Sequence, residues 1–363
     1  MSQADRIYNF SAGPSVLPLP VLEQAAAEMT NYRGCGMSVT EMSHRSKVYI
    51  DIFEETKSDL KRLMKIPDTH EILFIQGGAT LQFSAVPMNL IGKTGKADYA
   101  VTGNFSDLAM KEAKKYGEIS IACSSEDRNH MYIPSQKDIR VSDDASYFYY
   151  CSNNTIYGTE WKYTPETGDV PIVCDMSSNI LSVPVDVSKF GVIFAGAQKN
   201  MGPAGVAVVI IDKALAGSEL AFTPKLLSYQ VMIDSDSMHN TPPCYTIYML
   251  GLVLKWLDKQ GGVEGMEKIK SEKAQILYDM LDDSKMFIGH ADKAARSDMN
   301  ITFRTKSEEL DAKFVKEATN AGFDNLKGHR IVGGMRASIY NAMPIEGVQA
   351  LAKFMREFEA NSI

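Results

Sequence analysis

The chain has 363 residues, of which 45% are hydrophobic and 23% are charged, and its formal net charge is -7. This composition is typical of a soluble globular protein, and the length is more than one apolar core supports, so we expect a large domain plus a smaller one. The negative charge argues against a nucleic-acid partner.

The cysteines and the first residues of the sequence indicate in which cellular compartment the protein is expected. The five cysteines are odd in number and show no CxxC spacing, so neither a disulfide framework nor a metal site of cysteines is indicated. The start, MSQADRIYNF, is charged and lacks an apolar core of signal-peptide length. No later run approaches the ~18 apolar residues that cross a bilayer. We therefore expect a cytoplasmic protein.

The first predicted elements are helical. An alanine-rich helix begins near Pro20, and a glycine-containing loop then carries His44 and Arg45. A long amphipathic helix follows this loop. Its predicted buried stripe consists of Val48, Ile52, Leu60, Leu63 and Met64.

The segment HEILFIQGGATLQFSAV reads as strand, tight turn and helix. The strand Ile72–Ile75 ends at Gln76, two glycines turn the chain, and Ala79 and Thr80 open the helix. Free N–H groups at such a helix start, together with the helix dipole, favour a phosphate or another anion. A plain strand-to-helix turn is the competing interpretation.

Strand and helix patterns continue to alternate as far as Lys199, which predicts crossover connections and a mainly parallel sheet. Polar and aromatic side chains collect where the predicted strands end, at the edge where open α/β sheets bind ligands. These residues are Phe105, Asn154, Thr155, Asp175, Gln198 and Lys199.

Lys199 ends a buried apolar run, 192–197, and a turn at 202–205 follows it. A lysine at this edge of a sheet is partly desolvated, which frees its amine as a nucleophile for Schiff-base chemistry. The competing interpretation is a lysine that snorkels at a strand terminus.

After the turn, GVAVVIIDK predicts an antiparallel strand at the margin of the sheet. From Val263 a charged helix leads to a different pattern of strands and helices, in which RIVGGMRASIYN reads as a strand pair or a bulged strand. The last third therefore predicts a small α+β domain of about a hundred residues.

Together these features meet the needs of pyridoxal phosphate (PLP). This cofactor needs a lysine, a carboxylate for its ring nitrogen, an anion cradle and a flat aromatic group. Lys199, Asp175, the turn 77–80 and Phe105 are candidates for these four roles.

Sequence motifs along the whole chain carry a resemblance. They are NFSAGP, SHRS, QGG with QFSAVP, VTGNFS, SNNTIYGTE, CDMSSN, GAQKNMGPAG, HNTPP and GHRIVGGMRASIYN. The chain resembles the phosphoserine aminotransferase family, class V members of PLP-dependent fold type I. The resemblance implies an α/β fold with a mainly parallel seven-stranded sheet. It places a large domain at residues 16–262 and a smaller α+β domain at 1–15 and 263–363.

The same resemblance assigns cofactor roles. Lys199 forms the Schiff base and Asp175 pairs with the pyridinium nitrogen, so these two are the expected catalytic residues. The other expected cofactor-binding residues are Ala79, Thr80, Phe105, Thr155 and Gln198, with Asn240 and Thr241 reaching the cofactor of the partner subunit in a homodimer.

The resemblance also implies ping-pong transamination in serine and pyridoxine biosynthesis. This reaction interconverts O-phosphoserine plus 2-oxoglutarate and 3-phosphohydroxypyruvate plus glutamate. Arg336 is expected to hold the α-carboxylate, while cationic residues of both subunits hold the second anionic group. The expected substrate-binding residues are Ala12, His44, Arg45, His329, Arg330 and Arg336.

One position departs from the family pattern. Many members carry tryptophan where this chain has Phe105. Phenylalanine has a smaller face and no N–H, so we expect a modest change in cofactor affinity with catalysis intact.

Three other functions are compatible with parts of the sequence pattern. A cysteine desulfurase needs a nucleophilic cysteine in the C-terminal part, and no cysteine follows Cys244. An alanine- or serine-glyoxylate aminotransferase of the same fold has less use for a second cationic cluster. A non-catalytic, Rossmann-like binding protein, in which Lys199 is structural, is the alternative from a different class.

Overall fold

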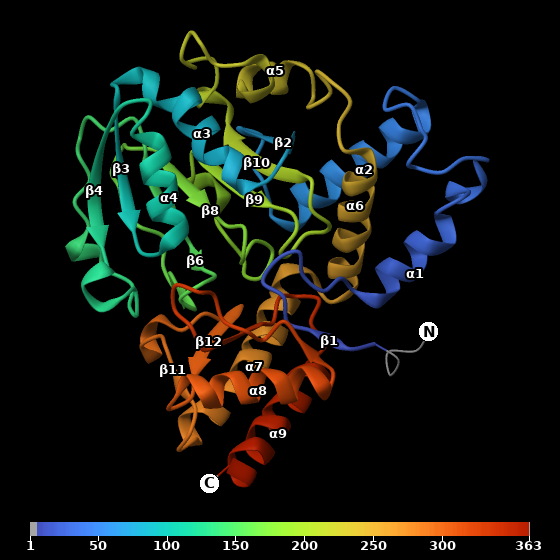
Figure 1. Cartoon of the computed structure of the whole chain (residues 1–363). Coiled ribbons are helices and arrows are strands. Elements are labelled where there is room, and N and C mark those ends of the chain that lie inside the picture. The colour runs from blue at the N-terminus through green and yellow to red at the C-terminus, as the bar shows by residue number, and fades with distance from the viewer. Residues whose placement is uncertain (1–5, 363) are drawn as a thin grey trace.

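The computed structural model describes residues 6–362. Helices and strands alternate through its first part, and Figure 1 shows them gathered around one large sheet, with the C-terminal elements below it. The α-helices are α1 (Leu19–Glu28), α2 (Lys47–Leu63), α3 (Ala79–Leu90), α4 (Asn104–Ala113), α5 (Tyr229–Asp234), α6 (Cys244–Lys259), α7 (Gly262–Asp283), α8 (Glu308–Asn320) and α9 (Ile345–Ser362). None of the helices within 6–362 is long and apolar enough to cross a membrane.

The central sheet has seven strands in the order β2-β10-β9-β8-β5-β3-β4. They are β2 (His70–Gln76), β3 (Lys96–Val101), β4 (Glu118–Ser124), β5 (Phe148–Cys151), β8 (Ile172–Asp175), β9 (Val192–Gly196) and β10 (Val206–Asp212). Neighbouring strands are parallel, except that β10 is antiparallel to both β2 and β9. The predicted α/β fold with a mainly parallel seven-stranded sheet is therefore confirmed.

The position predicted for the strand after Lys199 is partly wrong. β10 is antiparallel as expected, but it lies one strand inside the margin, and β2 forms the edge. Val206 to Ile211 of β10 are fully buried. A strand that is apolar on both faces gains most from neighbours on both sides, and β10 obtains them from β9 and β2.

Apolar residues on both faces of the sheet explain why helices cover both. In β9, Ile193 and Ala195 join a core with α1, α2 and α6, while Val192 and Phe194 join a second core with α3 and α4. This alternation follows from the two-residue repeat of a strand.

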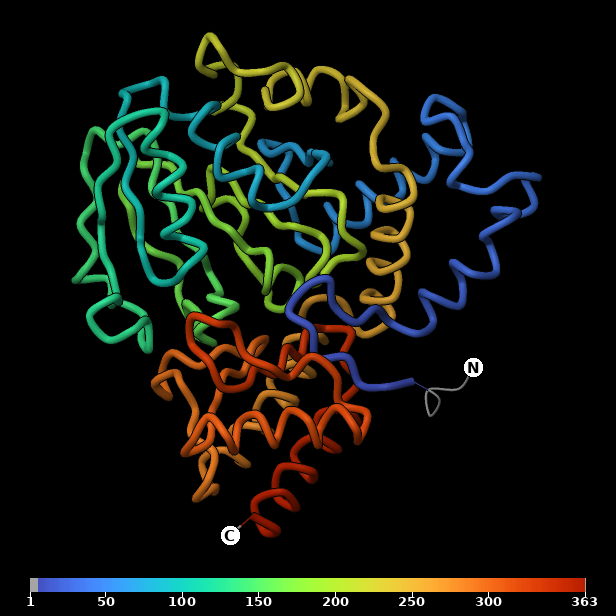
Figure 2. The backbone as a smooth tube through the Cα atoms, in the orientation of Figure 1, coloured from blue at the N-terminus to red at the C-terminus, as the bar shows by residue number. Residues whose placement is uncertain are grey.

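A third apolar core lies among the C-terminal elements. It unites Phe10 with residues of α7, α8 and α9 and of a three-stranded sheet in the order β11-β12-β14. Those strands are β11 (Ile288–Gly289), β12 (Asn300–Arg304) and β14 (Met335–Ser338). β1 (Tyr8–Asn9) lies against this part in Figure 2, because it pairs in parallel with β13 (Phe323–Asp324). A further two-stranded pair is formed by β6 (Asn153–Asn154) and β7 (Thr159–Glu160).

The segment RIVGGMRASIYN is less regular than predicted. Only Met335–Ser338 forms a strand, and the residues before it turn. Gly333 and Gly334 have φ angles of +76° and +60°, a left-handed conformation that interrupts a strand and that glycine adopts without strain.

Candidate active site

A cavity of about 260 Å³ opens where β8 and β9 end and the C-terminal elements begin. It brings together ten of the predicted site residues, which come from segments far apart in the sequence. Those residues are Ala12, Ala79, Thr80, Phe105, Thr155, Asp175, Gln198, Lys199, His329 and Arg336. The sheet edge therefore gathers these side chains as parallel strand ends do in open α/β sheets.

Lys199 follows β9 and lies at the centre of this cavity. Its Nζ donates a hydrogen bond to Thr155 Oγ1 at 2.8 Å and stands 4.8 Å from the centroid of the Phe105 ring. Removal from bulk water lowers the pKa of Lys199, and the carboxylate of Asp175 opposes this effect. A lowered pKa leaves a larger fraction of the amine unprotonated and nucleophilic.

Asp175 is the last residue of β8 and is 4% exposed. Its Oδ1 accepts hydrogen bonds from Ser177 N at 2.8 Å and from Ser177 Oγ at 2.6 Å. Burial raises the pKa of Asp175, while Lys199 and the Ser177 donors act in the opposite direction. The carboxylate is thus held in one orientation and is suited to pair with a buried cationic N–H.

The N-terminus of α3 forms one end of the cavity. Gly77 turns the chain with a φ angle of +102°, and the N-cap Gly78 offers no side chain to cap the helix. The Gln198 amide lies beside this turn. A Cβ added at Gly196 would stand 2.8 Å from Gln198 Oε1 and 3.3 Å from Ala79 N, so the two groups flank the same point. Within residues 6–362, Gln198 Oε1 is buried without a hydrogen-bond partner. An anion fits beside the N–H groups that open the helix and beside Gln198 Nε2, because these groups donate to it, whereas the Oε1 acceptor does not contribute to binding an anion.

Arg336 of β14 approaches the cavity from the C-terminal part. Its Nε is buried and has no hydrogen-bond partner among the described residues, and burial lowers the pKa of Arg336. His329 lines the same cavity, and its pKa is lowered by burial and by the charges of Arg336 and Arg330. An unsatisfied guanidinium fork is suited to bind a carboxylate in bidentate fashion.

The N-terminal segment closes the cavity beneath Lys199. The carbonyl of Ala12 accepts a hydrogen bond from Tyr340 Oη at 2.7 Å, and Ser15 Oγ donates to the carbonyl of Lys199. Gly13 has a φ angle of +148°, and a Cβ there would stand 3.2 Å from Lys199 Cγ. The close approach of this segment to Lys199 therefore depends on glycine.

Five predicted site residues do not line this cavity: His44, Arg45, Asn240, Thr241 and Arg330. His44 and Arg45 lie in the turn before α2, and the carbonyl of Thr241 accepts a hydrogen bond from Gln76 Nε2 near the end of β2. Arg330 is exposed, although the adjacent His329 lines the cavity.

Sequence reasoning missed four residues that line the cavity, Gly13, Phe83, Ile156 and Ser177, whereas Gly78 belongs to the predicted turn 77–80. Ser177 had a usable signal, because a serine two positions after an aspartate at a strand end commonly donates back to that carboxylate. Phe83 and Ile156 carry no signal that distinguishes them from ordinary core residues.

Comparisons with known proteins agree with this geometry. Residues 7–351 match the family model described as aminotransferase class-V. A phosphoserine aminotransferase of Nitrosomonas europaea is 53% identical, covering 98% of this chain and 99% of the relative. The solved phosphoserine aminotransferase of Bacillus circulans subsp. alkalophilus superposes with a TM-score of 0.97 at 46% identity, covering 99% and 100% of the two chains. The PLP-bound phosphoserine aminotransferase of Trichomonas vaginalis superposes with a TM-score of 0.93 at 41% identity, covering 97% and 100%.

Proposed function

This chain belongs to the class V aminotransferases. We propose that it acts in serine biosynthesis and interconverts O-phosphoserine plus 2-oxoglutarate and 3-phosphohydroxypyruvate plus glutamate. The observation that carries the proposal is a single cavity lined by Lys199, by Asp175 and by Arg336, whose Nε is buried without a hydrogen-bond partner among residues 6–362. Relatives at about half identity over their whole length carry the phosphoserine aminotransferase name. An alanine- or serine-glyoxylate activity and a non-catalytic binding protein are not favoured.

The cofactor is PLP, which when bound supplies an electron sink for the charge left on the substrate Cα. Lys199 would hold the cofactor, and its amine would act as the acid-base group that moves the proton bound to the substrate Cα. Asp175 holds the proton on the ring nitrogen, and Ser177 holds the carboxylate in place.

The remaining cofactor contacts divide between the two ends of the cavity. The main-chain amides of Ala79 and Thr80, with the side-chain amide of Gln198, bind the phosphate. Thr155 binds the ring hydroxyl, and Phe105 covers the ring face.

The substrate residues follow from charge. Arg336 binds the α-carboxylate that phosphoserine and glutamate share, and His329 binds the second anionic group. Ala12 forms the facing wall through its main chain. Arg330 is proposed to act with His329, which requires the exposed turn around it to close over the substrate.

We propose that the protein is a homodimer with shared active sites. His44, Arg45, Asn240 and Thr241 lie outside the cavity of their own chain, which supports their action on the partner's site. Sedimentation of the purified protein tests the dimer. A mixture of Arg45→Ala and Lys199→Ala chains tests sharing, because hybrid dimers regain one intact site only if Arg45 acts across the interface.

The division of the chain is proposed to follow residues 16–262 and residues 1–15 with 263–363, of which 1–5 lie outside the described residues. The separate apolar core that unites Phe10 with α7 to α9 supports this division. Val263 and Met266 pack in the other core, so α7 begins in the larger unit. Five cysteines without a disulfide support a reducing cytoplasm as the compartment.

A half-reaction tests the proposed function. The purified PLP-loaded protein is mixed with phosphoserine alone, and the loss of the yellow absorbance is followed. Phosphoserine and glutamate are expected to bleach the protein at micromolar to millimolar concentrations, whereas alanine is not. Bleaching by alanine with no response to phosphoserine would contradict the proposal, and a colourless protein that takes up no PLP would contradict any transaminase function.

A further inference from the structure

A second lysine, Lys273 on α7, is fully buried outside the cavity described above. Its Nζ lies within hydrogen-bond distance of four main-chain carbonyl oxygens, at 3.2 Å from Ile339, 2.8 Å from Tyr340, 3.3 Å from Asn341 and 3.0 Å from Met343, so its three N–H donors are shared among four acceptors. No carboxylate within residues 6–362 forms an ion pair with it. We name this arrangement the Lys273 cage.

A buried ammonium without a counter-ion is costly unless hydrogen bonds replace its hydration. Burial lowers the pKa of Lys273 to about 7, and the four carbonyl oxygens oppose that change because they accept from the protonated form. An ammonium has three N–H donors and no acceptor, so it draws carbonyls of one turn towards a single point, as a bound cation does. The cage therefore fixes the backbone of 339–343.

This turn reaches the active site at two points. The hydroxyl of Tyr340 donates to the carbonyl of Ala12 at 2.7 Å, and Ala12 lines the cavity. The amide of Asn341 donates to Asn200 Oδ1 at 2.9 Å, and Asn200 directly follows Lys199.

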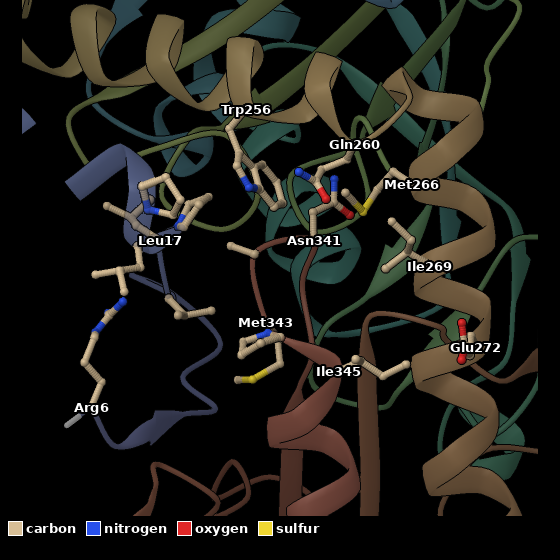
Figure 3. Close-up of a pocket in the computed structure, with 16 residues that line it drawn as sticks. Arg6, Leu17, Trp256, Gln260, Met266, Ile269, Glu272, Asn341, Met343 and Ile345 are labelled. Atoms are coloured by element: carbon tan, nitrogen blue, oxygen red, sulfur yellow. The ribbon is translucent and has the colours of Figure 1, made fainter. Parts of the chain in front are cut away.

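The other side of the turn borders a cavity, although Met343 is 2% exposed and also belongs to the third apolar core. Figure 3 shows Asn341, Met343 and Ile345 facing Trp256 of α6 and Ile269 of α7 across an opening of about 390 Å³. The residues that line such an opening restrain the backbone only weakly on that side, because their side chains have no partner atoms within the opening. The Lys273 cage adds to the other contacts that hold this turn, which include the hydrogen bond from Asn341 Nδ2 to the carbonyl of Leu181 at 2.9 Å.

We propose that Lys273 is a positioning residue for the transamination: by gathering the carbonyls of 339–343 it sets Tyr340 against Ala12 and Asn341 against Asn200, and so aligns the substrate wall with Lys199. The inference rests on the proposed function, since the alignment matters only if Lys199 is the reacting group.

The test compares Lys273→Gln with a matched control, Lys270→Gln, in the PLP-loaded protein. Lys270 lies about one turn earlier on the same helix and is 3% exposed, but it pairs with Asp298 at 2.6 Å, and within residues 6–362 its amine forms no hydrogen bond with the turn. Misplacement of a reacting group by about 1 Å costs up to ~100-fold in rate. We expect kcat/KM for phosphoserine to fall about tenfold further in Lys273→Gln than in the control.

Hydrogen exchange provides a readout that does not depend on activity. The amide of Asn341 should exchange faster in Lys273→Gln but not in Lys270→Gln, because only the first loses the cage. If the wild-type protein is inactive towards phosphoserine while this exchange pattern holds, the proposed function fails and the structural role of the cage stands. Equal exchange in the two variants would overturn the proposal.

A second variant covers the case in which Lys273→Gln does not fold. Tyr340→Phe removes only the hydroxyl that reaches Ala12 and should lower kcat/KM for phosphoserine severalfold. Where both single variants fold, their double variant should lose less than the product of the two effects, because residues that act through one contact are not additive. Wild-type kcat/KM in Tyr340→Phe, or fully multiplicative effects, would refute the role of Lys273.

Discussion

Substitution of Arg336 by lysine tests how the substrate carboxylate is recognised. Lysine keeps the positive charge but lacks the planar fork that binds both oxygens of a carboxylate. The buried Nε of Arg336, which has no partner among the described residues, indicates a fork prepared for a ligand. Arg336→Lys should therefore weaken binding without abolishing the reaction.

The magnitude follows from the hydrogen bonds at stake. Loss of one charge-assisted bond costs about 1.5–3 kcal/mol, and each 1.4 kcal/mol corresponds to about tenfold in binding. KM should rise by about 10- to 100-fold for both phosphoserine and glutamate, because both carry the α-carboxylate. The control is Arg304→Lys, on the neighbouring strand β12, where the arginine is exposed and donates to the carbonyl of Val332.

Steady-state kinetics with each substrate varied in turn provides the measurement. The reasoning is refuted if Arg336→Lys changes both KM values no more than Arg304→Lys does. A rise for one substrate alone would show that Arg336 does not bind the α-carboxylate, which both substrates share.

Three further outcomes are expected. Phe105→Trp should lower the dissociation constant for PLP, measured by titration of the cofactor-free protein, because indole offers a larger face to the ring; an unchanged constant would count against a stacking role. Lys199→Ala should abolish turnover, and borohydride should no longer attach PLP to the chain; retained activity would exclude Lys199 as the reacting amine. The Arg296 and Lys293 cations hold the pKa of Asp282 below its usual 3.8. A carboxylate with a lowered folded-state pKa stabilises the protein above its unfolded-state pKa, and this stabilisation is lost as pH falls. The destabilisation caused by Asp282→Asn, measured by urea unfolding, should therefore be present at pH 7 and shrink below about pH 4. A difference that does not vary with pH would show that these ion pairs contribute nothing.

The parts of the site that could be predicted have signals within a few residues of sequence. Lys199 and Asp175 each follow a short apolar strand, and the α3 N-terminus follows a pair of glycines. Because parallel strands place their carboxyl ends at one edge, local patterns sufficed to bring these residues together. The roles of Arg336 and His329 came from family motifs instead, since nothing in their local pattern points to the sheet.

The parts that could not be predicted depend on contacts between distant segments. The pattern of β10 shows that it is buried but not which strands flank it. Lys273 lies in the charged stretch KIKSEKAQ and reads as a surface lysine, yet it is fully buried. Helical periodicity identifies an apolar stripe, but it does not reveal a lysine whose partners are main-chain carbonyls more than sixty positions away.

The place of β2 at the edge of the sheet affects the order in which the protein matures. β2 pairs only with β10 in that sheet, so the strand that leads into the Gly77 turn has no partner until residues 206–212 leave the ribosome. Pairings across so long a stretch of chain form late, because loop closure must come first. During this interval an apolar strand stays open to other nascent chains, and a chain cut short before β10 keeps that liability permanently. The turn at Gly77 therefore gains its supporting strand pair only after β10 has formed.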